Sequence, residues 1–194
     1  MKKERPVGNA LILCAITLVA GLLLSFVNEL TTGPIEQAQL AAKAEAYVSV
    51  YPDAASFGAV DGADELLASA ATEIPAAGYT TGSVTDVMTA LDGSGNVIGY
   101  VLSAVSKGGY GGDITIALGV DLNGTVTGFS PLQHSETPGF GAKCADESYI
   151  ATFPGITSSE EVDAITGATF TTTAIKEAVG AGLYFVDQML LAGS

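Results

Sequence analysis

The sequence has no tryptophan, one histidine and two cysteines among its 194 residues. Cys14 lies in a long apolar run and Cys144 lies far from it in the chain that follows, so both are expected to be unpaired. There is no C-x-x-C pair, and His134 has no second histidine to act with it. The sequence therefore predicts neither a disulfide framework nor a zinc or haem site built from protein ligands.

Basic residues are also scarce. Lysine and arginine total 7 against 21 acidic residues, which gives a formal net charge of −14. Lys2, Lys3, Arg5 and Glu4 precede the apolar run, so the remainder has 4 basic and 20 acidic residues and carries about −16. Nucleic-acid binding needs a basic face, so this charge argues against it, and it also argues against adhesion to anionic lipid.

An uncharged run of 22 residues, at 7–28, is long enough to cross a bilayer as a helix, which takes about 20 apolar residues. A cleavable signal peptide is the alternative interpretation. The run is longer than a usual signal core, however, and residues 25–28 offer no small-x-small cleavage site. The basic start places the N-terminus in the cytoplasm. We therefore expect a single-pass anchor in the cell (inner) membrane, with the rest of the chain outside the cytoplasm.

The chain after the anchor has room for one compact domain of about 150 residues. Thr-Thr-Gly-Pro at 31–34 predicts the end of the membrane helix, and residues 35–51 are typical of a second, alanine-rich helix. Residues 54–81 have weak periodicity and are expected to form helix and loop. The predicted organisation is a cytoplasmic start and transmembrane helix at 1–30, a juxtamembrane helix at 31–52 and an outer domain at 53–194.

The pattern changes to β-structure between residues 84 and 132. Asp-Gly-Ser-Gly at 92–95 separates a run at 84–91 from one at 96–106, and Asn-Gly at 123–124 separates 114–120 from 125–129. Apolar residues alternate along the third run, which buries one face of that strand. Two hairpins followed by helices predict an α+β domain with a largely antiparallel sheet flanked by helices.

An amphipathic helix is predicted after residue 169. Its apolar residues recur at spacings of four, four, three and four, which is the stripe of a helix packed on a core. Either Thr172 or Thr173 is expected to cap it. The stripe consists of Ile175, Val179, Leu183, Val186 and Leu190.

The turn before that helix suits a phosphate. Gly167 and Ala168 place no bulk beside the hydroxyl of Thr169, and the first amides of a helix lack intrahelical partners at the positive end of its dipole. Thr169 is therefore placed to carry a phosphate ester.

Asp163, Thr166, Gly167, Ala168 and Thr169 together resemble the D-x-x-[S/T]-G-A-T pattern at which flavin transferases attach flavin mononucleotide (FMN) to threonine through its phosphate. The pattern is similar to that of the G subunit of the Rnf-type ion-translocating electron transport complex, an FMN-binding domain family related to the C subunit of the Na⁺-translocating NADH:quinone reductase. The resemblance implies that Thr169 carries the covalent FMN and that Asp163 matters while the flavin is installed.

Two further segments resemble the same family. His134, Glu136, Thr137 and Gly139 match its H-x-E-T-P-G segment, and the resemblance implies that this loop forms one wall of the flavin site. The glycine-rich segment at 107–112 is similar to the family's G-Y-G-G segment, which implies that Tyr110 lies near the flavin ring. The glycine spacing fits neither a Walker loop nor a dinucleotide fingerprint. The predicted cofactor-binding set also includes Thr172.

The resemblance implies an electron-carrier subunit of a membrane complex that couples electron transfer between ferredoxin and NAD to ion translocation. Such a chain is a redox subunit and not a complete enzyme, because the flavin supplies the redox chemistry and partner subunits act on the substrates. Its expected partners are the other membrane subunits of the complex and, during maturation, a flavin transferase.

Three alternatives remain open from the sequence. The chain could be the C subunit of the quinone reductase, although that subunit is usually longer. It could be a stand-alone membrane flavoprotein that passes electrons to an outside acceptor. From a different class of protein, it could be an anchored binding module outside the cytoplasm without a cofactor.

Overall fold

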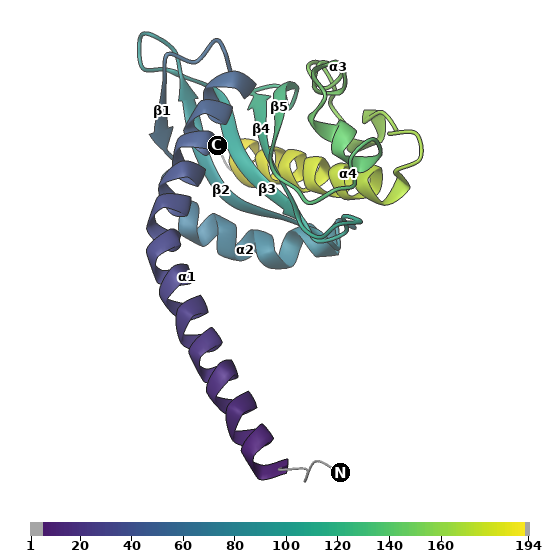
Figure 1. Ribbon diagram of the computed structural model, residues 1–194. Coiled ribbons are helices and arrows are strands. Elements are labelled where there is room, and N and C mark those ends of the chain that lie inside the picture. Colours follow the sequence, from purple (N-terminus) through teal and green to yellow (C-terminus); the bar gives the residue numbers. More distant parts are fainter. Residues whose placement is uncertain (1–5, 193–194) are drawn as a thin grey trace. The chain divides into compact units, whose positions relative to one another are not determined.

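The computed structural model describes the backbone of residues 6–192 and the side chains of residues 10, 12–25 and 42–192. The chain divides into two compact units, Met1–Ala42 and Lys43–Ser194 (Figure 1). Helix α1 (Pro6–Val50) makes up the described part of the first unit, and its last turns belong to the second. No helix of the described residues combines the length and the apolarity that crossing a membrane requires. The span expected at 7–28 therefore stays a prediction.

The helix break expected at 31–34 is wrong, because α1 continues through these residues. A proline inside a helix removes one backbone hydrogen bond and causes local crowding, and this can kink a helix without ending it. The residues that follow, up to Val50, favour helix strongly enough to continue it. The residues expected to form a membrane helix and a separate juxtamembrane helix thus belong to a single helical element.

The second unit is built on a five-stranded antiparallel sheet with the strand order β1-β2-β3-β4-β5. Each strand pairs with its neighbours in sequence, so the sheet is a simple meander. The two hairpins and the α+β class predicted from the sequence are confirmed. The strands are β1 (Ser56–Ala59), β2 (Gly82–Leu91), β3 (Val97–Ser106), β4 (Ile114–Asp121) and β5 (Val126–Gln133).

The two predicted hairpin turns use one design. Each turn begins with an aspartate whose Oδ1 accepts two backbone N–H groups. Asp92 accepts those of Ser94 and Asn96. Asp121 accepts those of Asn123 and Thr125. The Asn96 side chain also donates to Asp92, and these hydrogen bonds hold the pKa of Asp92 below its ordinary value. Aspartate is frequent in turns for this reason.

The segment 54–81 contains an element that the sequence did not predict. Helix α2 (Ala63–Ala76) agrees with the expected helix and loop, but β1 was missed. With four residues and no alternation, β1 carries too little pattern to be recognised as a strand. It forms because its backbone pairs with the edge of β2, which is a tertiary contact.

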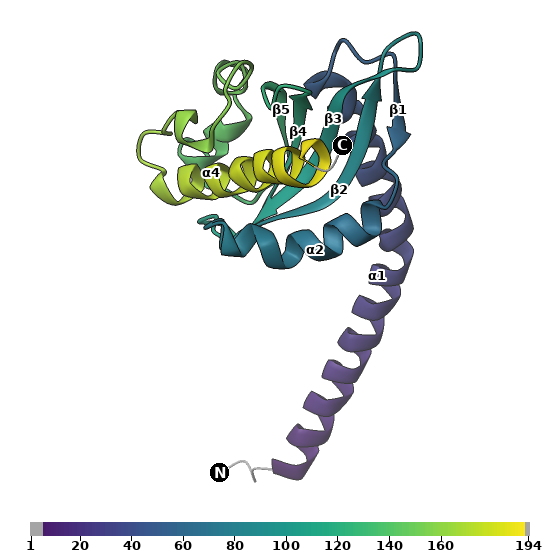
Figure 2. The same ribbon diagram turned by 180° about the vertical axis from the view of Figure 1, so that it is seen from behind.

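The sheet separates two apolar clusters, and Figure 2 shows α4 (Thr169–Tyr184) and α2 from the side of the larger one. On β3, Leu102 and Ala104 belong to this larger cluster, whereas Val101 belongs to the smaller cluster together with Val50 from the last turns of α1. Successive side chains of a strand point to opposite faces of the sheet, so apolar side chains are buried on both faces. Short helical segments complete the unit: η1 (Gly141–Ala145), α3 (Glu147–Ile150), η2 (Ser159–Glu161) and η3 (Phe185–Leu191), a π-helical continuation of α4.

Helix α4 begins earlier than predicted, at Thr169. Its N-cap residue, Ala168, makes no side-chain capping bond, so the expected cap by Thr172 or Thr173 is wrong. Thr172 instead lies within the first turn, where its hydroxyl accepts the N–H of Ile165 at 3.0 Å and donates to the carbonyl of Ala168. The helix start is thus tied back to the preceding turn.

Two glycines let the end of α1 pack on the sheet. A Cβ on Gly128 would lie 2.6 Å from both the Cα and the carbonyl oxygen of Val50, and a Cβ on Gly119 would also meet that carbonyl. The hydroxyl of Thr127 donates to the same oxygen at 2.7 Å, and Tyr51 donates to the carbonyl of Ile98 at 2.6 Å. Backbone held by these hydrogen bonds has little freedom to move away from an added methyl group.

We therefore expect Gly128→Ala to lower the free energy of unfolding by about 1–3 kcal/mol, the usual cost of overpacking. Urea unfolding of the purified full-length chain, followed by circular dichroism, measures it. Gly93→Ala is the matched control, because a Cβ there meets nothing within 4 Å. Equal unfolding midpoints for the two variants would show that α1 does not press on the sheet at Gly128.

Candidate functional site

A cavity of about 360 Å³ opens beside the start of α4. Three segments that are distant in sequence form its walls: the loop between β3 and β4, the segment from the end of β5 into η1, and the first turn of α4. Its volume is in the range of small-molecule sites in proteins. The lining residues are Tyr110, Glu136, Thr137, Phe140, Gly141, Gly167, Ala168, Thr169, Phe170 and Thr171.

Thr169 lies at the rim of this cavity as the first residue of a 16-residue helix. Its side chain is exposed. The turn before it is closed by a hydrogen bond from the N–H of Ala168 to the carbonyl of Ile165, and Gly167 takes a φ of 81° at the position of such a turn that requires a positive φ. The first N–H groups of α4 have no partners within the helix, so an anion beside Thr169 would meet them.

Glu136 forms the floor of the cavity, with 6% of its surface exposed. Its Oε1 accepts the N–H of Gly111 at 2.9 Å, and its Oε2 accepts the hydroxyl of Thr171 at 2.5 Å. Its own N–H donates to Nδ1 of His134 at 3.4 Å. One carboxylate thus joins the three walls of the cavity: the β3–β4 loop, the segment after β5 and the first turn of α4.

Glycines allow this approach. A Cβ on Gly111 would meet the carbonyl of Ser135, and a Cβ on Gly141 would meet both Oε2 of Glu136 and the hydroxyl of Thr171. Side chains at these positions would push the walls apart or fill the space between them. The glycine-rich segment at 107–112 is therefore more than a flexible connector, because its backbone packs directly on the segment that carries Glu136.

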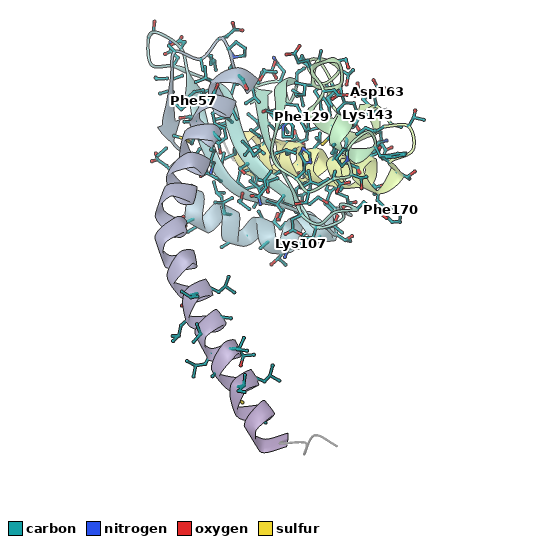
Figure 3. All side chains as sticks on the ribbon, in the orientation of Figure 1. Phe57, Lys107, Phe129, Lys143, Asp163 and Phe170 are labelled. Carbon is teal, nitrogen blue, oxygen red and sulfur yellow. The ribbon has the colours of Figure 1, made fainter. Side chains whose placement is uncertain are left out.

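Exposed aromatic rings surround the mouth of the cavity. Tyr110, Phe140 and Phe170 are 72%, 55% and 67% exposed, although apolar rings are usually buried. The ring centroids of Tyr110 and Phe170 lie 6.3 Å apart at an angle of 40°. Figure 3 labels Phe170 at the outer end of α4. A cavity with an apolar rim, a carboxylate floor and free amides at one end suits a flat ring system that carries a phosphate.

Six of the residues predicted for the site line the cavity. They come from all three sequence segments that carried the family resemblance. These residues are Tyr110, Glu136, Thr137, Gly167, Ala168 and Thr169.

The other five predicted residues lie outside the cavity lining. His134 and Gly139 shape the loop around Glu136, the first through the hydrogen bond to Nδ1 and the second through a φ of 79°. Thr166 belongs to the turn before α4. The carbonyl of Asp163 accepts the hydroxyl of Tyr149 at 3.0 Å, and Thr172 is buried with its hydroxyl already bonded to backbone.

Four lining residues were not predicted: Phe140, Gly141, Phe170 and Thr171. Phe140 and Gly141 directly follow the H-x-E-T-P-G segment, and Phe170 and Thr171 directly follow Thr169. The sequence signals that could have identified these four residues are their position next to the motifs and the aromatic character of Phe140 and Phe170. The contact between Thr171 and Glu136 carried no sequence signal, because 35 residues separate them.

Cys144, in η1, is fully buried with a free thiol. Burial raises its pKa to about 11, and the negative charge of Glu136 adds to the increase. A thiol with a raised pKa is a poor nucleophile. Cys144 is unpaired, as the sequence predicted.

Comparisons with known proteins match both parts of the chain. Residues 109–184 match the family model of the FMN-binding domain, and residues 1–50 match that of the RnfG N-terminal region. Among solved structures, NqrC of Shewanella oneidensis is similar, with a TM-score of 0.44 and 24% identity over 56% of this chain and 61% of that one.

Two relatives match over most of their length. The chain is 30% identical to the G subunit of the Na⁺-translocating ferredoxin:NAD⁺ oxidoreductase complex of Acetobacterium woodii, over 87% of this chain and 86% of that protein. It is 29% identical to the G subunit of the ion-translocating oxidoreductase complex of Methanosarcina acetivorans, over 89% of both chains. With this identity over this length, the chain belongs to the family of G subunits of Rnf-type ion-translocating oxidoreductase complexes.

Proposed function

We propose that the cavity holds one FMN, bound covalently through its phosphate to Thr169, and that the chain relays electrons as the G subunit of an ion-translocating oxidoreductase complex in the membrane. The match of residues 109–184 to the FMN-binding domain and the names of the relatives support the cofactor and the complex. The geometry around Thr169 supports the attachment point.

One observation carries the proposal. Five threonines cluster around the start of α4, and Thr169 alone among them is exposed and lines the cavity. Thr171 lines it too, but this side chain is 1% exposed and its hydroxyl is bonded to Glu136. Thr172 is buried, and Thr166 and Thr173 are exposed away from the lining. Among these five, Thr169 therefore has the one hydroxyl that is both exposed to a transferase and next to a flavin in the cavity.

The residues present fit FMN. The helix start offers unpartnered amides to a phosphate. The missing Cβ of Gly141 keeps the floor open, and Tyr110, Phe140 and Phe170 offer apolar surface to a planar ring. Attachment would form a bond from Oγ1 of Thr169 to phosphorus, while a leaving group departs from that phosphorus and takes up the hydroxyl proton. A flavin transferase would supply the activated flavin.

The flavin, when bound, accepts and donates the electrons. The chain's own residues hold it: Thr169 fixes its position, the aromatic rim shields the ring from water, and Glu136 keeps the walls together. Covalent attachment would prevent loss of the carrier outside the cytoplasm. Electrons would enter from one neighbouring redox centre of the complex and leave to the next.

The side chains of α1 support a membrane anchor. Eight large apolar side chains between Ile12 and Leu24 are each more than half exposed, so this part of the helix has an apolar surface that the described residues leave open. Exposed apolar surface of this extent marks a membrane or protein contact. With the basic residues that precede it, the proposed orientation has a cytoplasmic N-terminus and an outer C-terminal domain.

Thr169→Ala is expected to abolish covalent flavin, because no oxygen remains to form the ester, whereas Thr169→Ser keeps a hydroxyl and should retain part of it. The measurement is flavin fluorescence per chain after acid precipitation, with protein produced together with a flavin transferase. Thr173→Ala is the matched control, since it removes an exposed hydroxyl one turn further along α4. Both alanine variants should stay folded, at a cost of about 1 kcal/mol or less. Covalent flavin in Thr169→Ala would contradict the proposed attachment.

The proposed membrane topology can be tested with reporter fusions. An alkaline phosphatase fused after Ser194 should be active, because that enzyme works only outside the cytoplasm. A reporter that works only in the cytoplasm should be inactive at the same place. Mass spectrometry of the mature chain should recover residues 7–28. A mature chain that begins near Asn28 would show that the segment is a cleaved signal and not an anchor.

A further inference from the structure

Glu136 is the one buried carboxylate among the residues that the structure describes. No described lysine or arginine forms a salt bridge with it; the two ion pairs of the described domain are Lys43 with Asp86 and Lys176 with Glu160. Its two close partners, the N–H of Gly111 and the hydroxyl of Thr171, are both neutral donors. Burying a carboxylate without a cation costs free energy, so a position of this kind in a cavity indicates a functional charge.

Each oxygen of the Glu136 side chain lies within hydrogen-bond distance of a neutral donor, one from the β3–β4 loop and one from α4. A glutamate side chain is ordinarily ionised at neutral pH, and an ionised carboxylate has acceptors only. Burial is the main cause of the raised pKa of Cys144, and the charge of Glu136 adds to it. Low-dielectric surroundings screen such a charge much less than water does. Any group that occupies the cavity above Glu136 therefore lies in its field.

We propose that the Glu136 carboxylate lowers the reduction potential of the flavin held in this cavity and so makes it a stronger electron donor. This inference rests on the proposed function. An electron that the flavin accepts without a proton adds negative charge close to a fixed negative charge, so reduction to an anionic flavin becomes less favourable. Glu136 itself exchanges no electron and forms no bond. The electron arrives from one redox centre of the complex and leaves to the next.

A purely structural role for Glu136 is the competing explanation, since the carboxylate joins three walls of the cavity. Glu136→Gln separates the two roles. The amide oxygen of glutamine can still accept the N–H of Gly111, and its NH₂ group can donate to the hydroxyl oxygen of Thr171, which then acts as the acceptor. The variant keeps the connection and removes the charge.

The experiment is a redox titration of the full-length, flavin-loaded protein at low ionic strength, followed by flavin absorbance. Glu136→Gln should shift the reduction potential to a more positive value than in the wild type. Glu147→Gln is the matched control, because it makes the same chemical change at an exposed residue, where solvent screens the charge. Equal potentials for wild type and Glu136→Gln, or equal shifts in both variants, would overturn the inference.

A second variant decides the question if Glu136→Gln does not load flavin. Thr171→Val keeps the carboxylate and removes one hydrogen bond that offsets its charge, so the potential should become more negative. An unchanged or more positive potential in Thr171→Val would contradict the proposal. Flavin content per chain is measured in every sample. A wild-type chain without flavin would refute the proposed function, whereas loaded variants with unshifted potentials would refute only the role of Glu136.

Discussion

The candidate site depends on the two hydrogen bonds accepted by Glu136. One comes from the backbone of the β3–β4 loop and the other from the first turn of α4, and Glu136 itself follows β5. No other described contact connects all three walls. The sheet brings the segments near one another, but the carboxylate fixes the distance between them. Glycines at 111 and 141 are needed because a Cβ at either position would collide with this arrangement.

The sequence predicted the sheet well because the signals were local. Alternating apolar residues mark β4, and an aspartate with a glycine three residues later marks each hairpin turn. The elements that were missed depend on tertiary contacts. Strand β1 is recognisable only by its pairing with β2, and the continuity of α1 through Pro34 depends on the helix on either side, which outweighs a local helix breaker. Thr172 was expected to cap α4, but its hydroxyl accepts the N–H of Ile165 in the turn before the helix, a contact that the helical pattern does not indicate.

The sequence predicted which motif residues belong to the candidate site, but not the contacts between side chains inside it. The motif residues Thr169, Glu136 and Tyr110 do converge on one cavity, although 59 positions separate the first from the last of them. The sequence could not show that the hydroxyl of Thr171 is hydrogen-bonded to Glu136, and this contact is what distinguishes Thr171 from Thr169, the other threonine of α4 that lines the cavity. Nor could it show that Asp163 and Thr166 lie outside the cavity lining.

The central claim is that a flavin is attached at Thr169, which alone among the five threonines around the start of α4 is exposed and lines the cavity. Tandem mass spectrometry of peptides from wild-type protein produced with a flavin transferase tests it most directly. The account predicts one FMN per chain, on the peptide that contains Thr169, with fragment ions that assign it to that residue. An FMN assigned to Thr166, Thr171, Thr172 or Thr173, or a chain without covalent flavin, would contradict it.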